Sequence, residues 1–198
     1  TTTVAEAADS ISLIEIQQIE VNGVRAKSDT PIAFSAYTRE QIDERNYGED
    51  IPSILANMPS VVISSESGTG IGSTSLRVRG SDPSRINVTL NGVPMNDAET
   101  HSVYWYDTPD LISSVGSVQV QRGAGVSTNG AGAFGGAVSM TTDALSTEFR
   151  GSASLSYGSY NTNKQAVHIS SGLMRDHWVV DARLSHIGSD GYIERGAT

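Results

Sequence analysis

The chain has 198 residues, with 20 glycines, 6 prolines and no cysteine, which is enough for one ordinary domain and a small attachment. Its 22 acidic and 13 basic side chains give a net charge of -9, which excludes a general attraction to nucleic acid or anionic headgroups. The absence of cysteine excludes thiolate metal sites, thiol catalysis and disulfides. No apolar run approaches the roughly 20 residues of a membrane-spanning helix.

Charge and composition both change near residue 145. Residues 1–145 hold 17 acidic and 8 basic side chains, whereas residues 146–198 hold 5 of each. Mixed helix and strand signals precede this point, and short segments of strict alternation follow it. We therefore expect a flexible leader over 1–29, a small α+β unit over 30–145 and a strand region over 146–198.

The central unit opens with a strand and a short helix. An apolar and aromatic run predicts the strand over 31–37. Thr38 and Gln41 then form a Thr-x-x-Gln capping box, the pattern typical of a helix start. The expected helix covers residues 39–46, and Gly48 ends it.

The rest of the central unit alternates strands with turn signals. Asp50, with Pro52 in the first turn, opens a second helix that Pro59 stops. Asn91-Gly92 predicts a tight hairpin turn. Residues Thr108 and Pro109 predict a further helix over 110–114, and the expected strands cover 61–63, 75–80, 86–90, 118–121 and 138–141.

Four short motifs occur in one fixed order within this unit. They are Arg79-Gly80, Leu90 to Pro94, Val118 to Gly123, and the glycine-rich run Gly130 to Met140. In this order they resemble the plug domain of a TonB-dependent outer-membrane receptor. The resemblance implies a small mixed sheet with short helices, and it identifies as plug-motif glycines Gly80, Gly92, Gly123, Gly130, Gly132, Gly135 and Gly136.

The glycine-rich run also satisfies the dinucleotide-binding pattern GxGxxG. That pattern requires a helix after its last glycine, but residues 137–141 read as a strand. We therefore expect these glycines to let the backbone turn and approach its neighbours closely, where a Cβ would obstruct. The four histidines are too dispersed for a metal site, and no nucleophile elbow or P-loop occurs. We expect no enzyme activity, cofactor or metal.

Residues 146–198 predict membrane β-strands. Over nine residues from Phe149 to Tyr157, apolar and glycine positions alternate with Arg150 and serines, which is the length of a tilted transmembrane strand. Residues 158–161 turn the chain, residues 165–173 form a second strand, and after a turn at Arg175-Asp176 a third covers 178–185. The alternative is an antiparallel sheet of a soluble protein with one wet face.

The number of strands sets an expectation about length. The resemblance implies a barrel of about 22 strands, which needs some 200 residues or more for its strands alone. Only 53 residues follow Leu145. Because three strands cannot close a barrel, we expect the N-terminal part of a much longer receptor.

The leader contains a candidate contact for an energising partner. Its last residues alternate apolar and polar side chains, which suits an extended segment that adds to a partner's sheet edge. The resemblance implies that this stretch is a TonB box, which engages TonB; the alternative is a frayed strand or a linker. The candidate residues are Ile19, Glu20, Val21, Asn22, Gly23, Val24, Arg25 and Ala26.

Two plug stretches, 81–85 and 95–106, correspond in the resemblance to loops that line an external ligand chamber. An aromatic cluster in the second could stack on a planar or sugar ligand while His101 hydrogen-bonds or titrates. The alternative is that Trp105 and Tyr106 pack beneath the loop. The candidate ligand-facing residues are Asp82, Ser84, Arg85, His101, Tyr104, Trp105 and Tyr106.

Arg79 and Arg122 have a different expected role. Buried arginines that face a carboxylate-bearing barrel wall would hold the plug by bidentate pairs. We expect them to anchor the plug and not to bind ligand.

Three functions follow in order of expectation. The first is active import of a nutrient through the outer membrane, with the plug remodelled by TonB. An iron–siderophore complex is favoured, and haem, cobalamin and oligosaccharide are alternatives. The second is a passive surface-binding barrel protein, and the third a soluble nucleotide-binding enzyme. The expected partners are TonB, outer-membrane lipid and the external nutrient, with a surface lipoprotein as a further candidate and no nucleic acid.

Overall fold

The computed structural model describes residues 25–27, 29–124, 133–175 and 177–193. Its largest sheet has five strands in the order β1-β6-β7-β4-β5, in which β4 and β7 are parallel and the other neighbours antiparallel. The strands are β1 (Phe34–Tyr37), β4 (Ile86–Leu90), β5 (Val93–Pro94), β6 (Val115–Arg122) and β7 (Gly136–Thr142). This mixed sheet confirms the α+β expectation for the central unit.

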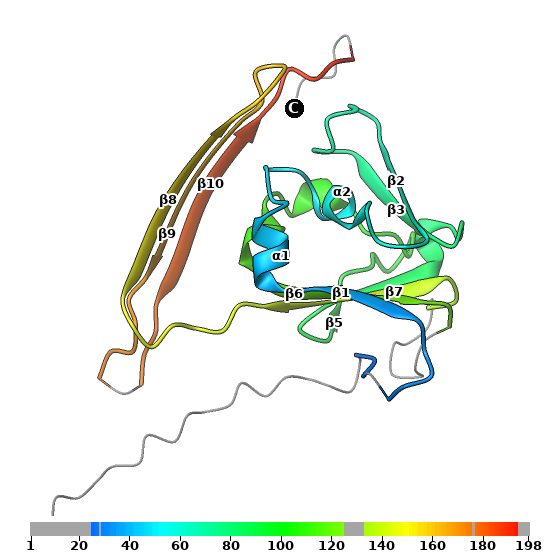
Figure 1. The fold of residues 1–198 in the computed structure, drawn as a ribbon, viewed down its shortest axis with the longest axis horizontal. Helices are drawn as coiled ribbons and strands as arrows, with labels where there is room; N and C mark the ends of the chain where they lie inside the picture. Colours follow the sequence, from blue (N-terminus) through cyan, green and yellow to red (C-terminus); the bar gives the residue numbers. More distant parts are fainter. Residues whose placement is uncertain (1–24, 28, 125–132, 176, 194–198) are drawn as a thin grey trace, which may run out of the picture.

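Two short α-helices cover one face of this sheet, and a hairpin lies beside them (Figure 1). The helices are α1 (Arg39–Asp43) and α2 (Ile51–Leu55), and the hairpin pairs β2 (Val61–Ser65) with β3 (Thr74–Val78). Three 3-10 turns complete the unit: η1 (Pro83–Arg85), η2 (Trp105–Asp107) and η3 (Leu111–Ser114). No helix in the described ranges has both the length and the hydropathy to span a bilayer.

The hydrophobic core lies between the sheet and the helices. Along β6, Val118 and Val120 are fully buried on the helix side, and Val138 and Met140 of β7 lie opposite them in register. Because side chains alternate along a strand, these four side chains lie on one face of the sheet and form an apolar patch beneath the helices. The helices and the hairpin contribute Ile42, Ile51, Ile54, Leu55, Leu76 and Val78 to the same cluster.

The first helix begins where the capping box predicts and ends early. Gln41 accepts a hydrogen bond from the Thr38 N–H at 3.1 Å, which confirms the box. The expected extent to residue 46 is wrong, because the Arg45 and Asn46 N–H groups donate to carbonyls three residues back, at Ile42 and Asp43. Such bonds tighten the last turn and end the helix.

The expected helix over 110–114 is also wrong in type. Asp110 adopts a left-handed conformation, with φ of 55°, and the segment after it is the 3-10 turn η3. The left-handed residue breaks helical continuity, and its side chain is used elsewhere, as described below. By contrast, the Asn91-Gly92 turn is confirmed: φ is 51° and 80° at the two positions, and β4 pairs with β5 across it.

Three long strands form a separate curved sheet along one side of the plug (Figure 1). They are β8 (Arg150–Tyr157), β9 (Asn163–Ser170) and β10 (Asp181–Gly188), antiparallel in the order β10-β9-β8. The first agrees with the expected strand. The second begins two residues earlier than expected, and the third begins three residues later because Trp178 bridges to Met174 within the intervening turn.

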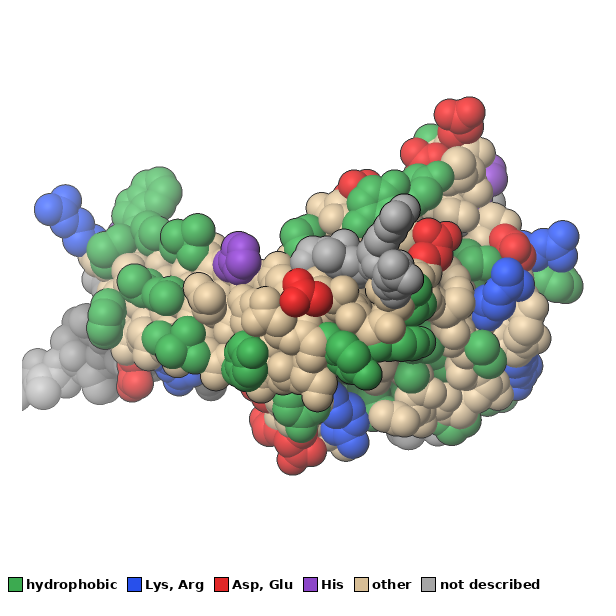
Figure 2. All heavy atoms as spheres, turned by 90° about the horizontal axis from the view of Figure 1, so that it is seen from above, with side chains coloured by type: hydrophobic (Ala, Val, Ile, Leu, Met, Phe, Trp, Pro, Cys, Tyr) green, Lys and Arg blue, Asp and Glu red, His purple; other side chains and the backbone are tan. Residues whose placement is uncertain are grey.

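The alternation of β8–β10 places apolar side chains on the face away from the plug. Leu155 and Leu184 are 84% and 80% exposed, and Tyr157, Val167 and Ile169 are also exposed. Hydrophobic side chains are accordingly spread over the part of the molecule at the left of Figure 2. The inner face carries Ser152, His168 and Arg183, which are aligned across the three strands.

Candidate functional site

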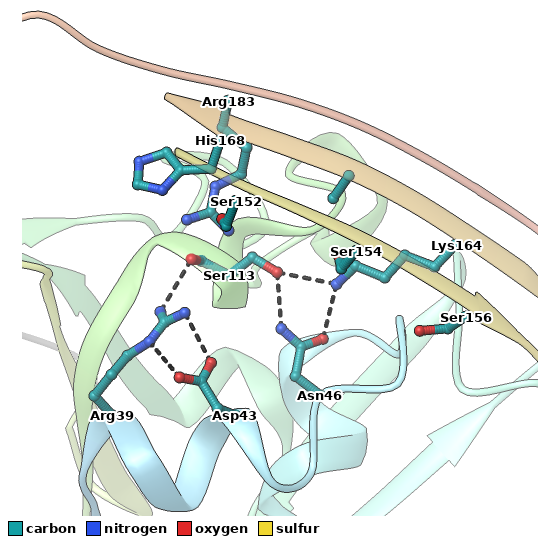
Figure 3. Close-up of a pocket in the computed structure, with 11 residues that line it drawn as sticks. Arg39, Asp43, Asn46, Ser113, Ser152, Ser154, Ser156, Lys164, His168 and Arg183 are labelled. Atoms are coloured by element: carbon teal, nitrogen blue, oxygen red, sulfur yellow. Dashed lines mark hydrogen bonds and ion pairs between the residues drawn. The ribbon is translucent and has the colours of Figure 1, made fainter. Parts of the chain in front are cut away.

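The boundary between the plug and the inner face of β8–β10 is the main polar site. A cavity of about 250 Å³ lies there, between α1 and η3 on one side and the three strands on the other (Figure 3). Its lining is almost entirely polar and comprises Arg39, Asp43, Asn46, Ser113, Ser152, Ser154, Ser156, Lys164, Ala166, His168 and Arg183. At this cavity the two parts therefore meet through polar groups.

A buried ion pair joins the plug to the strands at this cavity. Lys164 of β9 approaches Asp110 at 2.6 Å between Nζ and Oδ1, and the two side chains are 6% and 2% exposed. The ammonium also donates to Asn46 Oδ1 and Ser113 Oγ, each at 3.0 Å. All three N–H donors of Lys164 thus have acceptors on the plug, which is the condition for holding a buried charge.

The acceptors are themselves connected. Asn46 Nδ2 donates to Ser113 Oγ at 2.7 Å, and Ser113 donates to Asp110 Oδ1. Figure 3 shows Asn46 and Ser113 both directed at the end of Lys164. Asp110 Oδ2 is buried without a hydrogen-bond partner among the described residues. The lysine is therefore held by a preorganised set of groups from two separate plug segments.

A second charge cluster lies at the other end of the cavity. Arg39 pairs with Asp43 and Asp143 at 2.8 and 3.1 Å, and donates to the carbonyls of Ser113 and Val115, both at 3.0 Å. Burial raises the pKa of Asp143, and the nearby Arg39 guanidinium acts against this rise. Arg39 thereby connects α1 to the junction of η3 with β6.

This buried cluster was absent from the sequence prediction. Lys164 is one of only two lysines in the chain, and it falls on the same face of β9 as Ala166 and His168, which also line the cavity. That periodicity was the one available signal for an inward cation. Its partner Asp110 lies 54 residues earlier, so no local pattern connects them.

The expected anchors Arg79 and Arg122 lie elsewhere. Arg122 donates to Ser35 Oγ at 2.7 Å and to the Phe34 carbonyl at 3.2 Å, so it contacts β1 of the plug. Arg79 is exposed, and neither arginine forms an ion pair within the described ranges. In the ion pair between the plug and the described strands, the charges are the reverse of those predicted. The plug supplies the carboxylate of Asp110, and the strand supplies the cation of Lys164. Anchoring by Arg79 or Arg122 remains a prediction.

The predicted ligand-facing residues fall into an exposed group and a buried one. Tyr104 and Tyr106 are 39% and 54% exposed, with ring centroids 5.6 Å apart, and His101 is exposed. Trp105 is 4% exposed and belongs to the core cluster, which matches the alternative given for it. The loop is shaped by Asp97, which accepts hydrogen bonds from the Glu99 and Thr100 N–H groups.

The other predicted ligand-facing stretch is a self-contained turn. Asp82 accepts hydrogen bonds from the Ser84 N–H and hydroxyl at 3.1 and 2.8 Å, which lower the pKa of its carboxyl. Asp82 and Arg85 are exposed. Within the described residues, no hydrogen bond or ion pair joins this turn to the loop that carries Tyr104. The ligand role of both stretches remains a prediction.

Two residues of the predicted TonB box, Arg25 and Ala26, are described; residues 19–24 lie outside the described ranges. The Gln119 side chain accepts from the Ala26 N–H at 2.7 Å and donates to the Ala26 carbonyl at 2.9 Å. Arg25 donates to Ser117 Oγ at 2.8 Å. This end of the leader lies on the face of the sheet opposite α1 and α2 (Figure 1).

The last glycines of the glycine-rich run have the expected packing role. A Cβ on Gly136 would lie 2.7 Å from the Gln121 carbonyl oxygen, and one on Gly135 would lie 2.3 Å from Ser81 Cβ. Strand β7 starts at Gly136, so the run leads into a strand as predicted, and the helix of a dinucleotide site is missing there. Gly130 and Gly132 lie outside the described residues.

Comparisons with known proteins agree with the plug interpretation. Residues 26–137 match the family described as TonB-dependent Receptor Plug Domain. The probable TonB-dependent siderophore receptor PirA of Acinetobacter baumannii is 25% identical over 131 residues, which cover 61% of this chain and 17% of that receptor.

Solved receptor structures share the fold. The pyoverdine outer membrane receptor FpvA of Pseudomonas aeruginosa aligns with a TM-score of 0.64 at 20% identity, over 81% of this chain and 22% of FpvA. The alcaligin outer membrane receptor FauA of Bordetella pertussis aligns with a TM-score of 0.59 at 23% identity, over 82% of this chain and 27% of FauA. The chain thus spans between 17% and 27% of the length of these relatives. It belongs to the TonB-dependent receptor plug domain family.

Proposed function

We propose that this chain is the plug and the first barrel strands of an outer-membrane receptor that imports an iron–siderophore complex into the periplasm, energised by TonB. The observation that carries this proposal is a fold of the plug family packed against a sheet whose polar side chains face the plug and whose apolar side chains face outwards. On the inner face of β8–β10, Lys164 bonds to the plug, and His168 and Arg183 line the cavity between the two parts. Leu155 and Leu184 point away from the plug. This arrangement suits strands that have lipid on one side and a polar plug on the other.

The exposed tyrosines support an external ligand site. Tyr104 and Tyr106 present two aromatic rings at the surface, and His101 lies on the same loop. Aromatic faces can stack on planar groups of a chelator, while the imidazole supplies a hydrogen bond. The relatives named as receptors for siderophores, pyoverdine and alcaligin favour an iron chelate over haem, cobalamin or an oligosaccharide.

Energy-dependent uptake tests the proposal. The gene that carries this sequence is deleted in its native host, and uptake of ⁵⁵Fe bound to the host's siderophores is measured with and without a plasmid copy. We expect uptake to be lost on deletion, restored by the plasmid, and abolished by a protonophore that leaves surface binding intact. Binding without energised uptake would instead identify a passive surface receptor.

The leader provides a second test of the same function. Deletion of residues 19–26 removes the segment proposed to engage TonB, so uptake should fall to the level of the gene deletion while ligand binding persists. A deletion of equal length within residues 1–10 serves as the control. Normal uptake without residues 19–26 would refute the TonB-box assignment.

A further inference from the structure

Among the described residues, the end of the leader is attached to the plug by polar bonds to β6, with a longer bond of 3.5 Å from Arg25 to Thr141 of β7. Both backbone groups of Ala26 are bonded to the same Gln119 amide, so a single side chain imitates the pairing that a neighbouring strand would offer. Ala26 is 6% exposed and Gln119 is 5% exposed. Arg25 adds a bond to Ser117, two residues away on the same strand. This attachment, which we call the leader clamp, comprises Arg25, Ala26, Ser117 and Gln119.

The strand that holds the leader clamp is well secured. β6 is paired along one side with β7, over Val115 to Arg122, and along the other with β1. β1 is a four-residue edge strand whose only partner in the described sheet is β6. A pull on the leader that passed directly along the chain would reach β1 first and peel it from the sheet. The clamp instead transfers the pull to the longer, doubly paired strand.

The same strand leads directly to the barrel contact. The residues before β6 form η3, which contains Ser113 and follows Asp110. Asp110 and Ser113 both bind Lys164 of β9. Arg39 braces this junction through its two bonds to the carbonyls of Ser113 and Val115. Thus the chain between Asp110 and Gln119 connects the leader clamp with the buried ion pair to the barrel strand.

We propose that η3 and β6 carry mechanical load from the leader to the barrel contact, with Gln119 as the attachment point and the Asp110–Lys164 pair as the point of release. The source of the load rests on the proposed TonB-driven function; the path of the load follows from the contacts alone. Gln119 and Asp110 are therefore positioning residues that control the release of the plug.

The buried ion pair has the physical properties of a release point. At 2.6 Å between two side chains that are almost fully buried, the attraction is strong, and it weakens once water separates the charges. The polar cavity beside Lys164 offers room for that water. Small displacements should therefore leave the pair intact, and a larger one should break it in a single step.

Single-molecule pulling tests this path without TonB or a siderophore. The complete receptor encoded with this sequence is held in a bilayer, and constant tension is applied through a handle at its N-terminus. The time from the start of tension to the release of the plug from the barrel strands is recorded as the lifetime. Lys164→Met and Asp110→Asn should each shorten that lifetime about tenfold or more, because each breaks a buried charge pair. His168→Gln is the control, since the His168–Asp181 pair lies within β9 and β10.

The leader clamp gives a second readout on the same instrument. In Gln119→Leu, residues 26–37 should peel away before the plug is released, which adds an early extension of about 40 Å. The native receptor should lack this early step, a result that needs no variant to fold. An early step in the native receptor, or unchanged lifetimes in both ion-pair variants, would overturn the proposal. If the pulling results are as expected but the native receptor shows no energised uptake, only the proposed TonB-driven function is refuted.

Discussion

The plug and the strand sheet use one alternating pattern in opposite ways. In the plug, Val118 and Val120 point into a closed apolar core. In β8–β10, Leu155 and Leu184 point outwards, and the inner face is polar. A period of two therefore says which residues share a face but not which face is buried. The comparison teaches that the plug is stabilised by its own core, whereas its contact with the strands depends on a few placed charges.

The largest expected effect is at the charged contact. Lys164→Met should weaken the attachment of the plug by about 3–5 kcal/mol, because Asp110 is left buried without its cation. The double variant with Asp110→Asn should recover part of the loss. Denaturant titration of the complete receptor, followed through near-UV circular dichroism, measures both. Equal stability of native and Lys164→Met receptors would show that the contact is not electrostatic.

A pair of matched leucines tests the two faces directly. Leu55→Ala in α2 removes a fully buried side chain and should cost about 2–5 kcal/mol of unfolding free energy. Leu155→Ala in β8 removes a side chain that is 84% exposed and should leave the plug's stability unchanged. Thermal denaturation in detergent micelles compares them. A large loss of plug stability in Leu155→Ala would mean that this face packs against protein.

Two glycines make the same comparison at the backbone. Gly136→Ala in β7 places a Cβ 2.7 Å from the Gln121 carbonyl oxygen, and overpacking of this kind costs about 1–3 kcal/mol. Gly151→Ala in β8 meets no atom within 4 Å and should change stability by less than about 0.5 kcal/mol. Both variants are compared by midpoint of denaturation. Equal shifts would contradict the close packing at β7.

The smallest effect concerns a buried carboxylate of the plug. Burial raises the pKa of Asp50, against hydrogen bonds from Thr74 and Gly72 that lower it. With a raised folded pKa, the folded state binds the proton more tightly, so Asp50 costs stability as pH rises from its ordinary value of about 3.9 through the folded pKa. Asp50→Asn should therefore gain stability at pH 7, by less than about 1 kcal/mol because the amide keeps only one of the two oxygens that can accept from Thr74 and Gly72.

The pH dependence of that gain is the measurement. The stability difference between Asp50→Asn and native should shrink as pH falls through the folded pKa of Asp50. Thr74→Val, which removes the hydroxyl that donates to Asp50, is the companion variant. A difference that is constant between pH 4 and pH 7 would contradict the raised pKa.

Local signals in the sequence predicted local structure well. The Thr38–Gln41 capping box, the Asn91-Gly92 turn and the alternation in β8 each depend on a few neighbouring residues, and the structure confirms them. Apolar side chains on the outer face of the strand region were also expected, because the length and alternation of its segments suit a membrane strand.

Long-range features could not be predicted in the same way. The parallel pairing of β4 with β7 joins segments about 50 residues apart, and no turn specifies it. The Asp110–Lys164 pair depends on a left-handed residue before η3 and on the register of β9. Trp105 entered the core although its tyrosine neighbours did not, since the 3-10 turn η2 directs adjacent side chains to different sides.

Quenching of tryptophan by brominated lipid tests the central comparison most directly. The receptor is reconstituted in vesicles with all other tryptophans replaced by phenylalanine, leaving either Trp105 or a tryptophan introduced by Leu155→Trp. Fluorescence in brominated and unbrominated lipid is then compared. We predict strong quenching for Leu155→Trp and none for Trp105, which is buried in the plug core. An unquenched Leu155→Trp receptor would contradict the assignment of β8–β10 to a lipid-facing barrel wall.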